Sequence, residues 1–597
     1  MPTKQVINFS DLEIHPEYGF SYLKLLPKQK VVIKGDLDDS GDFSDLKLLL
    51  NHQTSMDIYV DLTKLRSDID LYAFHADIDL EADAAYVSST NSGISPERIF
   101  TRQKANKETL LQIRQNNPHF LFNSDRRFKM VINPYKTGQN PNIREPDDEK
   151  YYEQWHLFNG EFVDSNNADS AILNHDIGAP EAWKEHIGSR KIITAIIDTG
   201  VDLKHPDLID NLWVNDLELN GIPGEDDDSN GYVDDVHGWS FAQSGIGEDV
   251  DAVNSDWGVL EDPGSRGEPN GAPRFTQALV EGISHGTHVA GIIGARGNNG
   301  LGVCGVNWKA NLMTLNAAND NNSFFDPVLV EALHYALDNG AKVINLSLGG
   351  LWKLSPDELM SLSGDDFKNN YYDELKFTRK QFRKVLKKAT KKDALIIHSV
   401  GNDGDSRGDT RLWSDAGNLD DVSTNKIWSW FEGHPNLISV ASVDPDRRPS
   451  PYTNFGTGVD IAAPGGNVMK TQFFTDPVTG RILGSSTSNY GILSTVLPSN
   501  YGNDLKNYDY AEEAKGEYEK YQGTSMAAPV VSGAATLIWS KFPGLSAAEV
   551  KQALLESATM NPYLLGYVEN GRDLNLGAAM SLAKELNGPD IASIPDL

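Results

Sequence analysis

Short apolar runs alternate with amphipathic segments from about residue 190 onward, and this alternation constrains the fold more than any other feature. Four runs rich in Ile and Val have the composition of strands that are buried on both faces: KIITAIID (191–198), AKVINLSL (341–348), DALIIHSV (393–400) and NLISVASV (436–443). Between the first two, apolar residues recur at helical spacing over 329–337, and Gly340 stands where a helix would end. This pattern predicts an α/β domain with a doubly wound, mostly parallel sheet that helices cover on both faces.

The amino-terminal part of the chain has a different pattern. Residues 30–135 contain short β-type runs such as MDIYVDL and FKMVINPY, separated by turn residues, with helical periodicity only near Leu46–Leu50. A polar, proline-containing stretch follows these runs. We therefore expect a β-sandwich accessory domain at 1–140, a linker at 141–150 and the α/β domain at 151–590.

Two stretches interrupt the α/β pattern, and one motif marks its end. The polar, acidic residues 221–275 and the Ser-, Tyr- and Asn-rich residues 470–520 are interpreted as surface insertions. Near the carboxyl terminus, Ser546 and Glu549 have the spacing of a capping box, which predicts that a final helix begins there.

Charge and composition narrow the class of partner. The chain has 53 Lys and Arg against 85 Asp and Glu, a net charge of −32, which repels phosphate backbones and anionic membrane surfaces. Nucleic acid is therefore not an expected partner. No stretch reaches the roughly 18 apolar residues of a membrane span, so we expect a soluble protein. We also expect it to be monomeric. Because Cys304 is the single cysteine, no internal disulfide can form, so core packing must hold the fold and bound ions could add to its stability.

Four polar residues stand where these elements end or begin. Asp198 ends a strand, His285 precedes a helix patterned with Gly and Ala, and Asn402 follows the strand 393–400. Ser525 stands in the run GTSMAAP at the head of an apolar helix. Each one alone has an ordinary structural interpretation, as a turn acid, a turn amide or part of a closely packed helix. Because ligands bind at the carboxyl edge of such sheets, the four together indicate an acyl-transfer site.

The chemistry of acyl transfer assigns a role to each residue. Ser525 would be the nucleophile, His285 its general base, and Asp198 the carboxylate that orients the imidazole. The side chain of Asn402 and the backbone N–H of Ser525 would stabilise the oxyanion. Activity is then predicted to fall as pH drops through roughly 6 to 7. His288 lies further inside the helix, and for it we expect a buried structural role.

Several segments resemble the signature motifs of the subtilisin-like serine proteases, and they follow one another along the chain in the order of that family. IIDTGVDLKHPDL, HGTHVAGIIGA and GTSMAAPVVSGAA resemble the segments that carry the Asp, His and Ser of that family. INLSLGG and SVGNDG resemble its substrate-binding strand and oxyanion turn, and NFGTGVDIAAPGG (454–466) resembles the segment that follows them. The resemblance covers roughly 150–585 and implies a serine endopeptidase that acts on protein or peptide substrates. The alternative is a non-catalytic binding or scaffold protein on the same fold, which the loss of a triad residue would favour.

The resemblance also implies substrate contacts. Ser347, Leu348 and Gly349 would pair with an extended substrate as an added strand beside the P1 pocket. Asp403 stands where the family carries a residue that lines this pocket, and an acid there would favour a basic P1 side chain. The alternative is that Asp403 is a solvated acid in a turn.

Calcium is the expected ion, at two places. The resemblance maps a surface calcium site of the family onto Asp207 and Asn299. Separately, DDDSNGYVDD resembles the opening of a calcium loop, with oxygen donors at Asp226, Asp228 and Asn230, Gly231 for the turn, and Asp235 beyond. It departs from an EF-hand, because His237 stands where the bidentate Glu would be. The alternative is a solvated acidic loop.

Two features of the sequence give opposite expectations for the location of the protein. SDIDLYAF, followed by SSTNSGISPERI, resembles the pre-peptidase C-terminal domains of exported peptidases, although here it precedes the catalytic domain. This favours an extracellular location, whereas the start of the sequence has no apolar signal-peptide region and favours an intracellular one. No inhibitory propeptide is recognised, and self-processing near 140–155 is a hypothesis.

Overall fold

The computed structural model describes part of the chain in detail and divides it into two compact units. Described are the strands before residue 137 and residues 144–158, 176–241, 268–269, 284–318, 324–348, 365–404, 433–456, 458–475, 482–497 and 517–588. One unit consists of Met1–Glu145 with Phe158–Asp176, and the other of Pro146–Leu157 with Ile177–Leu597. The resemblance to a pre-peptidase C-terminal domain concerns the first unit and stays a prediction.

The first unit contains two sheets among its described residues, in the orders β1-β4-β11-β6-β9 and β2-β3-β5-β10-β7-β8. Strand β5 occupies the stretch with helical periodicity, because its residues pair with β10 on one side and with β3 on the other. The strands are β1 (Thr3–Asn8), β2 (Glu13–Ile14), β3 (Ser21–Lys24), β4 (Gln29–Asp36), β5 (Leu46–Asn51), β6 (Met56–Thr63), β7 (Ile69–His75), β8 (Val87–Ser89), β9 (Glu97–Gln103), β10 (Glu108–Gln115) and β11 (Arg127–Lys136).

The second unit is built on a ten-stranded sheet in the order β14-β13-β15-β12-β16-β17-β18-β19-β25-β24. Its neighbouring strands are parallel except at the two edges, where β14 and β24 run antiparallel to their neighbours. The strands are β12 (Thr194–Asp198), β13 (Gly238–Ser240), β14 (Glu268–Pro269), β15 (Leu312–Asn316), β16 (Val343–Leu346), β17 (Leu395–Ser399), β18 (Leu437–Val443), β19 (Ile461–Pro464), β24 (Thr559–Met560) and β25 (Arg572–Asp573).

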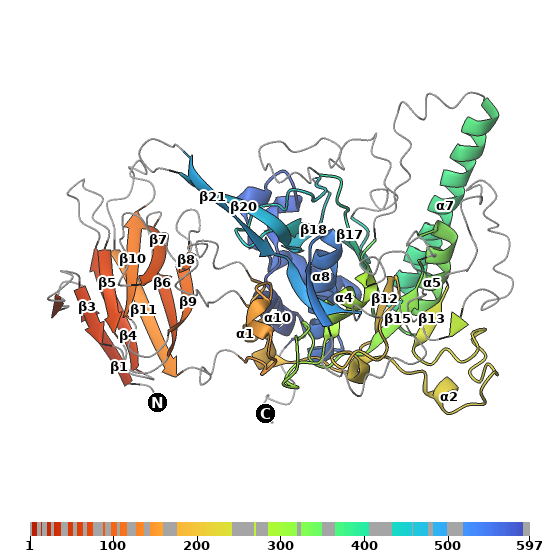
Figure 1. The fold of residues 1–597 in the computed structure, drawn as a ribbon, viewed down its shortest axis with the longest axis horizontal. Coiled ribbons are helices and arrows are strands. Elements are labelled where there is room, and N and C mark those ends of the chain that lie inside the picture. Colours follow the sequence, from red (N-terminus) through yellow and green to blue (C-terminus); the bar gives the residue numbers. More distant parts are fainter. Residues whose placement is uncertain are drawn as a thin grey trace, which may run out of the picture. The chain divides into compact units, whose positions relative to one another are not determined.

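Helices cover this sheet on both faces (Figure 1). The described helices of this unit are α1 (Ala179–Glu185), α2 (Asp216–Leu219), α4 (His285–Gly294), α5 (Asp326–Asp338), α7 (Asp365–Lys392), α8 (Thr524–Lys541), α9 (Ala547–Glu556) and α10 (Leu576–Leu586). Successive residues of β12 point to opposite faces. Ala195 and Ile197 join a core with α5 and α7, whereas the Thr194 hydroxyl contacts that of Thr536 on α8 at 2.7 Å. The expected doubly wound α/β fold is confirmed.

Small residues let α4 and α8 each pack closely against neighbouring segments of the chain. A Cβ added at Gly291 on α4 would lie 2.3 Å from the hydroxyl oxygens of Ser494 and Thr495, and one at Gly533 on α8 would lie 2.6 Å from Cβ of Val306. The glycines therefore allow an approach that any side chain would prevent. His288, on α4, is fully buried, and its Nε2 lies 3.0 Å from the Ile492 carbonyl oxygen, which confirms its expected buried position.

The carboxyl-terminal part differs from expectation in one respect. The capping box of Ser546 and Glu549 is present at the start of α9, as predicted. It does not begin the final helix, because α10 follows, capped by the Asn575 side chain, which accepts a hydrogen bond from the backbone N–H of Ala578.

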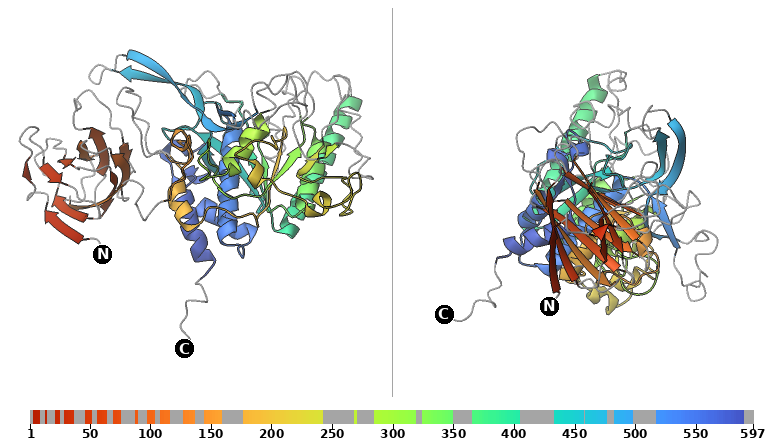
Figure 2. Two further views of the ribbon diagram at one scale, coloured as in Figure 1. Left: turned by 60° about the horizontal axis from the view of Figure 1, so that its bottom comes forward. Right: turned by 90° about the vertical axis from the view of Figure 1, so that its left-hand side faces the viewer.

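Residues between β19 and α8 form two antiparallel pairs. Strands β20 (Asn467–Thr475) and β21 (Ile482–Tyr490) make a ribbon that stands out from the rest of the second unit (Figure 2), and β22 (Ile492–Val496) pairs with β23 (Glu517–Tyr521). None of the helices described here is long and apolar enough to cross a membrane.

Candidate active site

The end of β12 and the start of α4 bring Asp198 and His285 together. Even-numbered residues of β12 face α4 and α8, so the Asp198 side chain points toward α4 at the carboxyl edge of the sheet. Nδ1 of His285 lies 2.7 Å from Oδ1 of Asp198, which also accepts a hydrogen bond from the backbone N–H of Thr199. Asp198 is fully buried, whereas the His285 side chain is 27% exposed. The imidazole therefore bridges a buried carboxylate and the surface.

The electrostatics of this pair favour a charged imidazole. Burial lowers the pKa of His285, but the nearby Asp198 carboxylate and its hydrogen bond raise it by more together, so that the pKa lies above its ordinary value. A histidine held in this way can accept a proton and be stabilised as the imidazolium.

Close backbone packing fixes the distance between the two elements. The N–H of Gly286 donates to the hydroxyl of Thr199 at 3.0 Å. A Cβ added at Gly286 would lie 2.2 Å from the carbonyl oxygen of Gly200 and 3.1 Å from Oδ1 of Asp198. Only glycine at this position lets the first turn of α4 approach the turn after β12 so closely.

Ser525 lies in the first turn of α8, where backbone N–H groups have no partners within the helix. Its hydroxyl donates a hydrogen bond to the carbonyl oxygen of Ser347 at 3.0 Å, and the Ser347 hydroxyl donates to the carbonyl oxygen of Ser525 at 2.7 Å. In this structure the Ser525 hydroxyl is thus hydrogen-bonded to the Ser347 carbonyl oxygen and not to His285.

Asn402 is exposed in the turn after β17, and Thr524 orients its amide. Oδ1 of Asn402 accepts hydrogen bonds from both the backbone N–H and the hydroxyl of Thr524, each at 2.9 Å. Neither Nδ2 of Asn402 nor the N–H of Ser525 has a hydrogen-bond partner among the described residues. A Cβ added at Gly523 would lie 3.3 Å from Nδ2 of Asn402 and 3.6 Å from the backbone nitrogen of Ser525. Both donors therefore border the same small volume.

The expected substrate-contact residues differ in their placement. Ser347 and Leu348 follow β16 and are buried, and Ser347 is joined to Ser525 as described above. Gly349 lies outside the described residues. Asp403 is half-buried, with Oδ2 accepting a hydrogen bond from Nδ2 of Asn454 at 2.9 Å and its N–H donating to Oδ1 of Asn454 at 3.0 Å.

The acidic loop before β13 gathers the expected oxygen donors. Asn230 links Asp228 and Asp235, because its Nδ2 donates to Oδ2 of each at 3.0 and 2.8 Å. The backbone N–H groups of Asn230 and Gly231 donate to the two carboxylate oxygens of Asp226. Burial raises the pKa of Asp235 to about 6. The loop is thus a folded structure and not an open acidic run.

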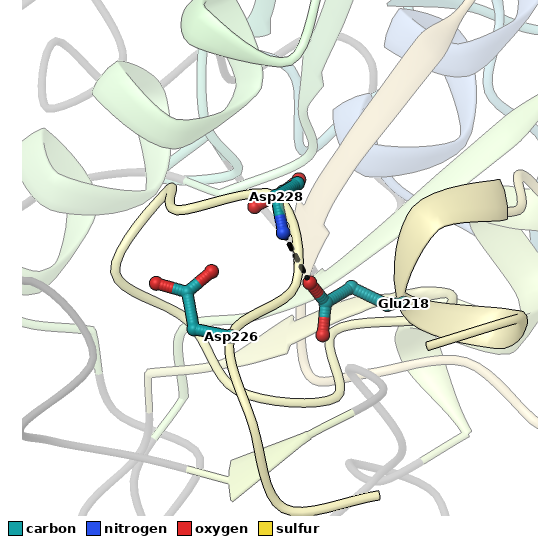
Figure 3. A group of neighbouring side chains, drawn as sticks. All are labelled: Glu218, Asp226 and Asp228. Atoms are coloured by element: carbon teal, nitrogen blue, oxygen red, sulfur yellow. Dashed lines mark hydrogen bonds between the residues drawn. The ribbon is translucent and has the colours of Figure 1, made fainter. Parts of the chain in front are cut away.

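Sequence reasoning missed one acid that contacts this loop. Glu218, at the end of α2, is buried, and its carboxylate accepts hydrogen bonds from the backbone N–H groups of Asp227, Asp228 and Asp234. One oxygen each from Glu218, Asp226 and Asp228 lie within 4.8 Å of one another (Figure 3). Among the described residues, this is the group of three or more acidic, histidine or cysteine side chains whose ligand atoms lie close enough together to hold a metal ion.

The second expected calcium pair is also brought together. Nδ2 of Asn299 donates to Oδ1 of Asp207 at 2.8 Å, while Oδ2 of Asp207 accepts from the N–H of Val303 and the hydroxyl of Tyr518. Burial raises the pKa of Asp207 and raises that of the nearby Asp148 to about 6. Both oxygens of Asp207 are thus occupied by hydrogen bonds.

Comparison with known proteins gives the following matches. The model of the subtilase family matches residues 189–579. Subtilisin-like protease 1 of Plasmodium falciparum is 26% identical over 419 residues, which cover 68% of this chain and 46% of the relative. The extracellular basic protease of Dichelobacter nodosus is 25% identical, with 66% and 48% covered. The major intracellular serine protease of Bacillus subtilis is 26% identical, with 64% and 79% covered.

This chain spans about half the length of the first of these relatives. Among solved structures, a protease from Pseudoalteromonas arctica aligns with a TM-score of 0.43 and 21% identity, covering 74% of this chain and all of that one. The family match extends over most of the second unit, from just before β12 to α10. The chain belongs to the subtilase family.

Proposed function

We propose that this chain is a serine endopeptidase that cleaves peptide bonds through an acyl-enzyme on Ser525. The observation that carries the proposal is the 2.7 Å contact between His285 and Asp198 in a chain of the subtilase family. The curated relatives named as proteases support it. A purely scaffolding role has less support, because Asp198, His285 and Ser525 are all retained.

The reaction begins when the Ser525 hydroxyl turns from the Ser347 carbonyl to Nε2 of His285. His285 then accepts the hydroxyl proton while Oγ attacks the substrate carbonyl, and Asp198 stabilises the imidazolium. The oxyanion of the tetrahedral intermediate would accept hydrogen bonds from Nδ2 of Asn402 and the N–H of Ser525, which border one volume. His285 gives its proton to the leaving amine, and water repeats the sequence to release the acyl group.

Substitution of the nucleophile tests this proposal. Ser525→Ala should abolish hydrolysis of denatured casein and leave the melting temperature within about 2 °C of wild type. Ser540→Ala changes a serine in the last turns of the same helix and should keep full activity. Equal loss in both variants, or retained hydrolysis by Ser525→Ala, would remove Ser525 from the chemistry.

We further propose that substrates bind as an added strand along 347–349 and that Asp403 favours a basic P1 residue. The position of Ser347 beside Ser525 supports the first part. The negative charge of Asp403, next to Asn402, is the basis of the second part, and one of its oxygens accepts a hydrogen bond from Asn454. Asp403→Asn should lower kcat/KM for a P1 Arg peptide more than for the matching P1 Phe peptide, and an equal effect on both peptides would rule out selectivity through Asp403.

We propose calcium as a structural ion held by the acidic loop. The donors there are all oxygens, which suit a hard cation, and the carboxylates of Glu218, Asp226 and Asp228 converge. When bound, calcium would offset the repulsion among these acids and tie α2 to the acidic loop. Asp207 and Asn299 remain a second candidate, with less support because the Asp207 oxygens already accept hydrogen bonds.

A further inference from the structure

Asn454 is fully buried and contacts the turn that carries Asn402 at four points. Its backbone N–H donates to the carbonyl oxygen of Gly401 at 2.9 Å, and its Nδ2 donates to that of Val400 at 2.7 Å. The same Nδ2 donates to Oδ2 of Asp403, and Oδ1 accepts from the N–H of Asp403. Three of these four hydrogen bonds use the Asn454 side chain.

These contacts hold the residues on either side of Asn402 and leave Asn402 itself untouched. Val400 and Gly401 are fixed before it, and Asp403 after it. Asn402 is exposed, and the hydrogen bonds of its own side chain go to Thr524. Asn454 therefore sets where the backbone of Asn402 lies, whereas Thr524 sets how the amide is turned.

The local backbone is shaped around this one side chain. Gly401 has a φ of +104°, and a Cβ there would lie 2.4 Å from Nδ2 of Asn454. A side chain at 401 would thus both strain the backbone and displace the amide. An amide at 454 supplies donors and an acceptor together, whereas an aspartate would lack the donors and place a second carboxylate against Asp403.

We propose that Asn454 is a positioning residue for the oxyanion donor, acting on the reaction only through Asn402. This inference rests on the proposed peptidase function. An oxyanion donor stabilises the transition state only if its N–H already lies where the charge develops, and a displacement of about 1 Å can cost about 100-fold in rate. Loss of the Asn454 amide removes the restraints on both sides of Asn402 and allows such a displacement.

A double-mutant cycle tests the inference. The active sites are first titrated with a serine-directed inhibitor, so that kcat is expressed per active site. Asn454→Ala should lower this kcat by about 10- to 100-fold and change KM by less than about 3-fold. In an Asn402→Ala background the same substitution should change kcat by less than about 2-fold, because the donor that it positions is already gone. Asn454→Ser, which keeps a hydroxyl donor and acceptor, should retain more of kcat and serves if the alanine variant folds poorly.

Asn211→Ala is the matched control. Asn211 is also fully buried, and its Nδ2 donates to two backbone carbonyl oxygens, those of Gly294 and Trp308. This control should lower the melting temperature as Asn454→Ala does and leave kcat per active site unchanged. The inference is overturned if Asn454→Ala and Asn454→Ser lose the same factor in both backgrounds, or lose no more kcat than Asn211→Ala. Failure of the peptidase proposal would look different, because wild type would then show no hydrolysis or Ser525→Ala would hydrolyse casein as well as wild type does.

Discussion

Replacing Gly286 with alanine perturbs the distance between the general base and its carboxylate without changing either residue. The added Cβ would lie 2.2 Å from the carbonyl oxygen of Gly200, roughly 1 Å closer than nonbonded atoms tolerate. Because the Cβ is fixed rigidly to the helix backbone and the Gly200 oxygen belongs to the backbone, the first turn of α4 must move away from the turn after β12. A shift of about 1 Å would lengthen the 2.7 Å contact between His285 and Asp198 to about 3.7 Å, beyond hydrogen-bond range.

The expected consequence is a loss of kcat of about 100-fold, because misplacement by 1 Å is enough to cost that much. Overpacking should also lower the free energy of unfolding by about 1 to 3 kcal/mol. The assay is kcat per titrated active site across pH, measured beside thermal unfolding. The apparent pKa of the rate profile should fall in the variant, because His285 loses part of the Asp198 interaction that raises its pKa.

Gly291→Ala on the same helix separates catalysis from stability. Its Cβ would lie 2.3 Å from two hydroxyl oxygens of Ser494 and Thr495, so it should also destabilise the fold. It lies more than one helical turn beyond His285 and should leave kcat per active site near wild type. Wild-type kcat in Gly286→Ala, or the same loss of kcat in both variants, would refute the reasoning.

Three further predictions concern the donor, the base and the ion. Asn402→Ala should lower kcat by about 100- to 1000-fold, a loss known for an oxyanion donor in a subtilisin and carried over here; an unchanged kcat would exclude the oxyanion role. In wild type, kcat/KM should fall as pH drops through a midpoint above 6.5, because the pKa of His285 is raised, and a midpoint below 6.5 would contradict this. Because folding raises the pKa of His285, the attraction between protonated His285 and Asp198 stabilises the fold at acid pH. This contribution is lost as pH rises through the raised pKa. Excess chelator should lower the melting temperature of wild type and have no such effect on Asp226→Asn/Asp228→Asn, whereas an equal effect on both would place the ion elsewhere.

The sequence predicted the parts of the fold that local pattern controls. The buried strands around β12 and β16 and the helix α5 follow from apolar runs and helical spacing, and these determine which edge of the sheet carries Asp198. The meeting of Asp198 with His285 followed because both lie at that edge. Parallel strands thus convert residues distant in sequence into neighbours, which is why their contact could be expected before any coordinates.

Contacts made by tertiary folding could not be predicted in this way. Glu218 precedes the acidic loop by several residues, and no periodicity marks it as the acid that binds three N–H groups of that loop. In the sequence, Asn454 has the pattern of an ordinary turn residue. Its proposed positioning role depends on hydrogen bonds to a turn about 50 residues earlier in the chain. Thr524 did carry a signal, because it stands next to Ser525, although the orientation of Asn402 by its hydroxyl requires the structure.

The most direct test of the account is to find where a fluorophosphonate attaches. The protein is treated with the reagent, digested, and mapped by mass spectrometry, with His285→Ala and Ser540→Ala treated in parallel. We predict a single adduct on Ser525 in wild type and in Ser540→Ala, and loss of that adduct in His285→Ala. An adduct on another residue, or equal labelling of Ser525 without His285, would contradict the assignment of nucleophile and base.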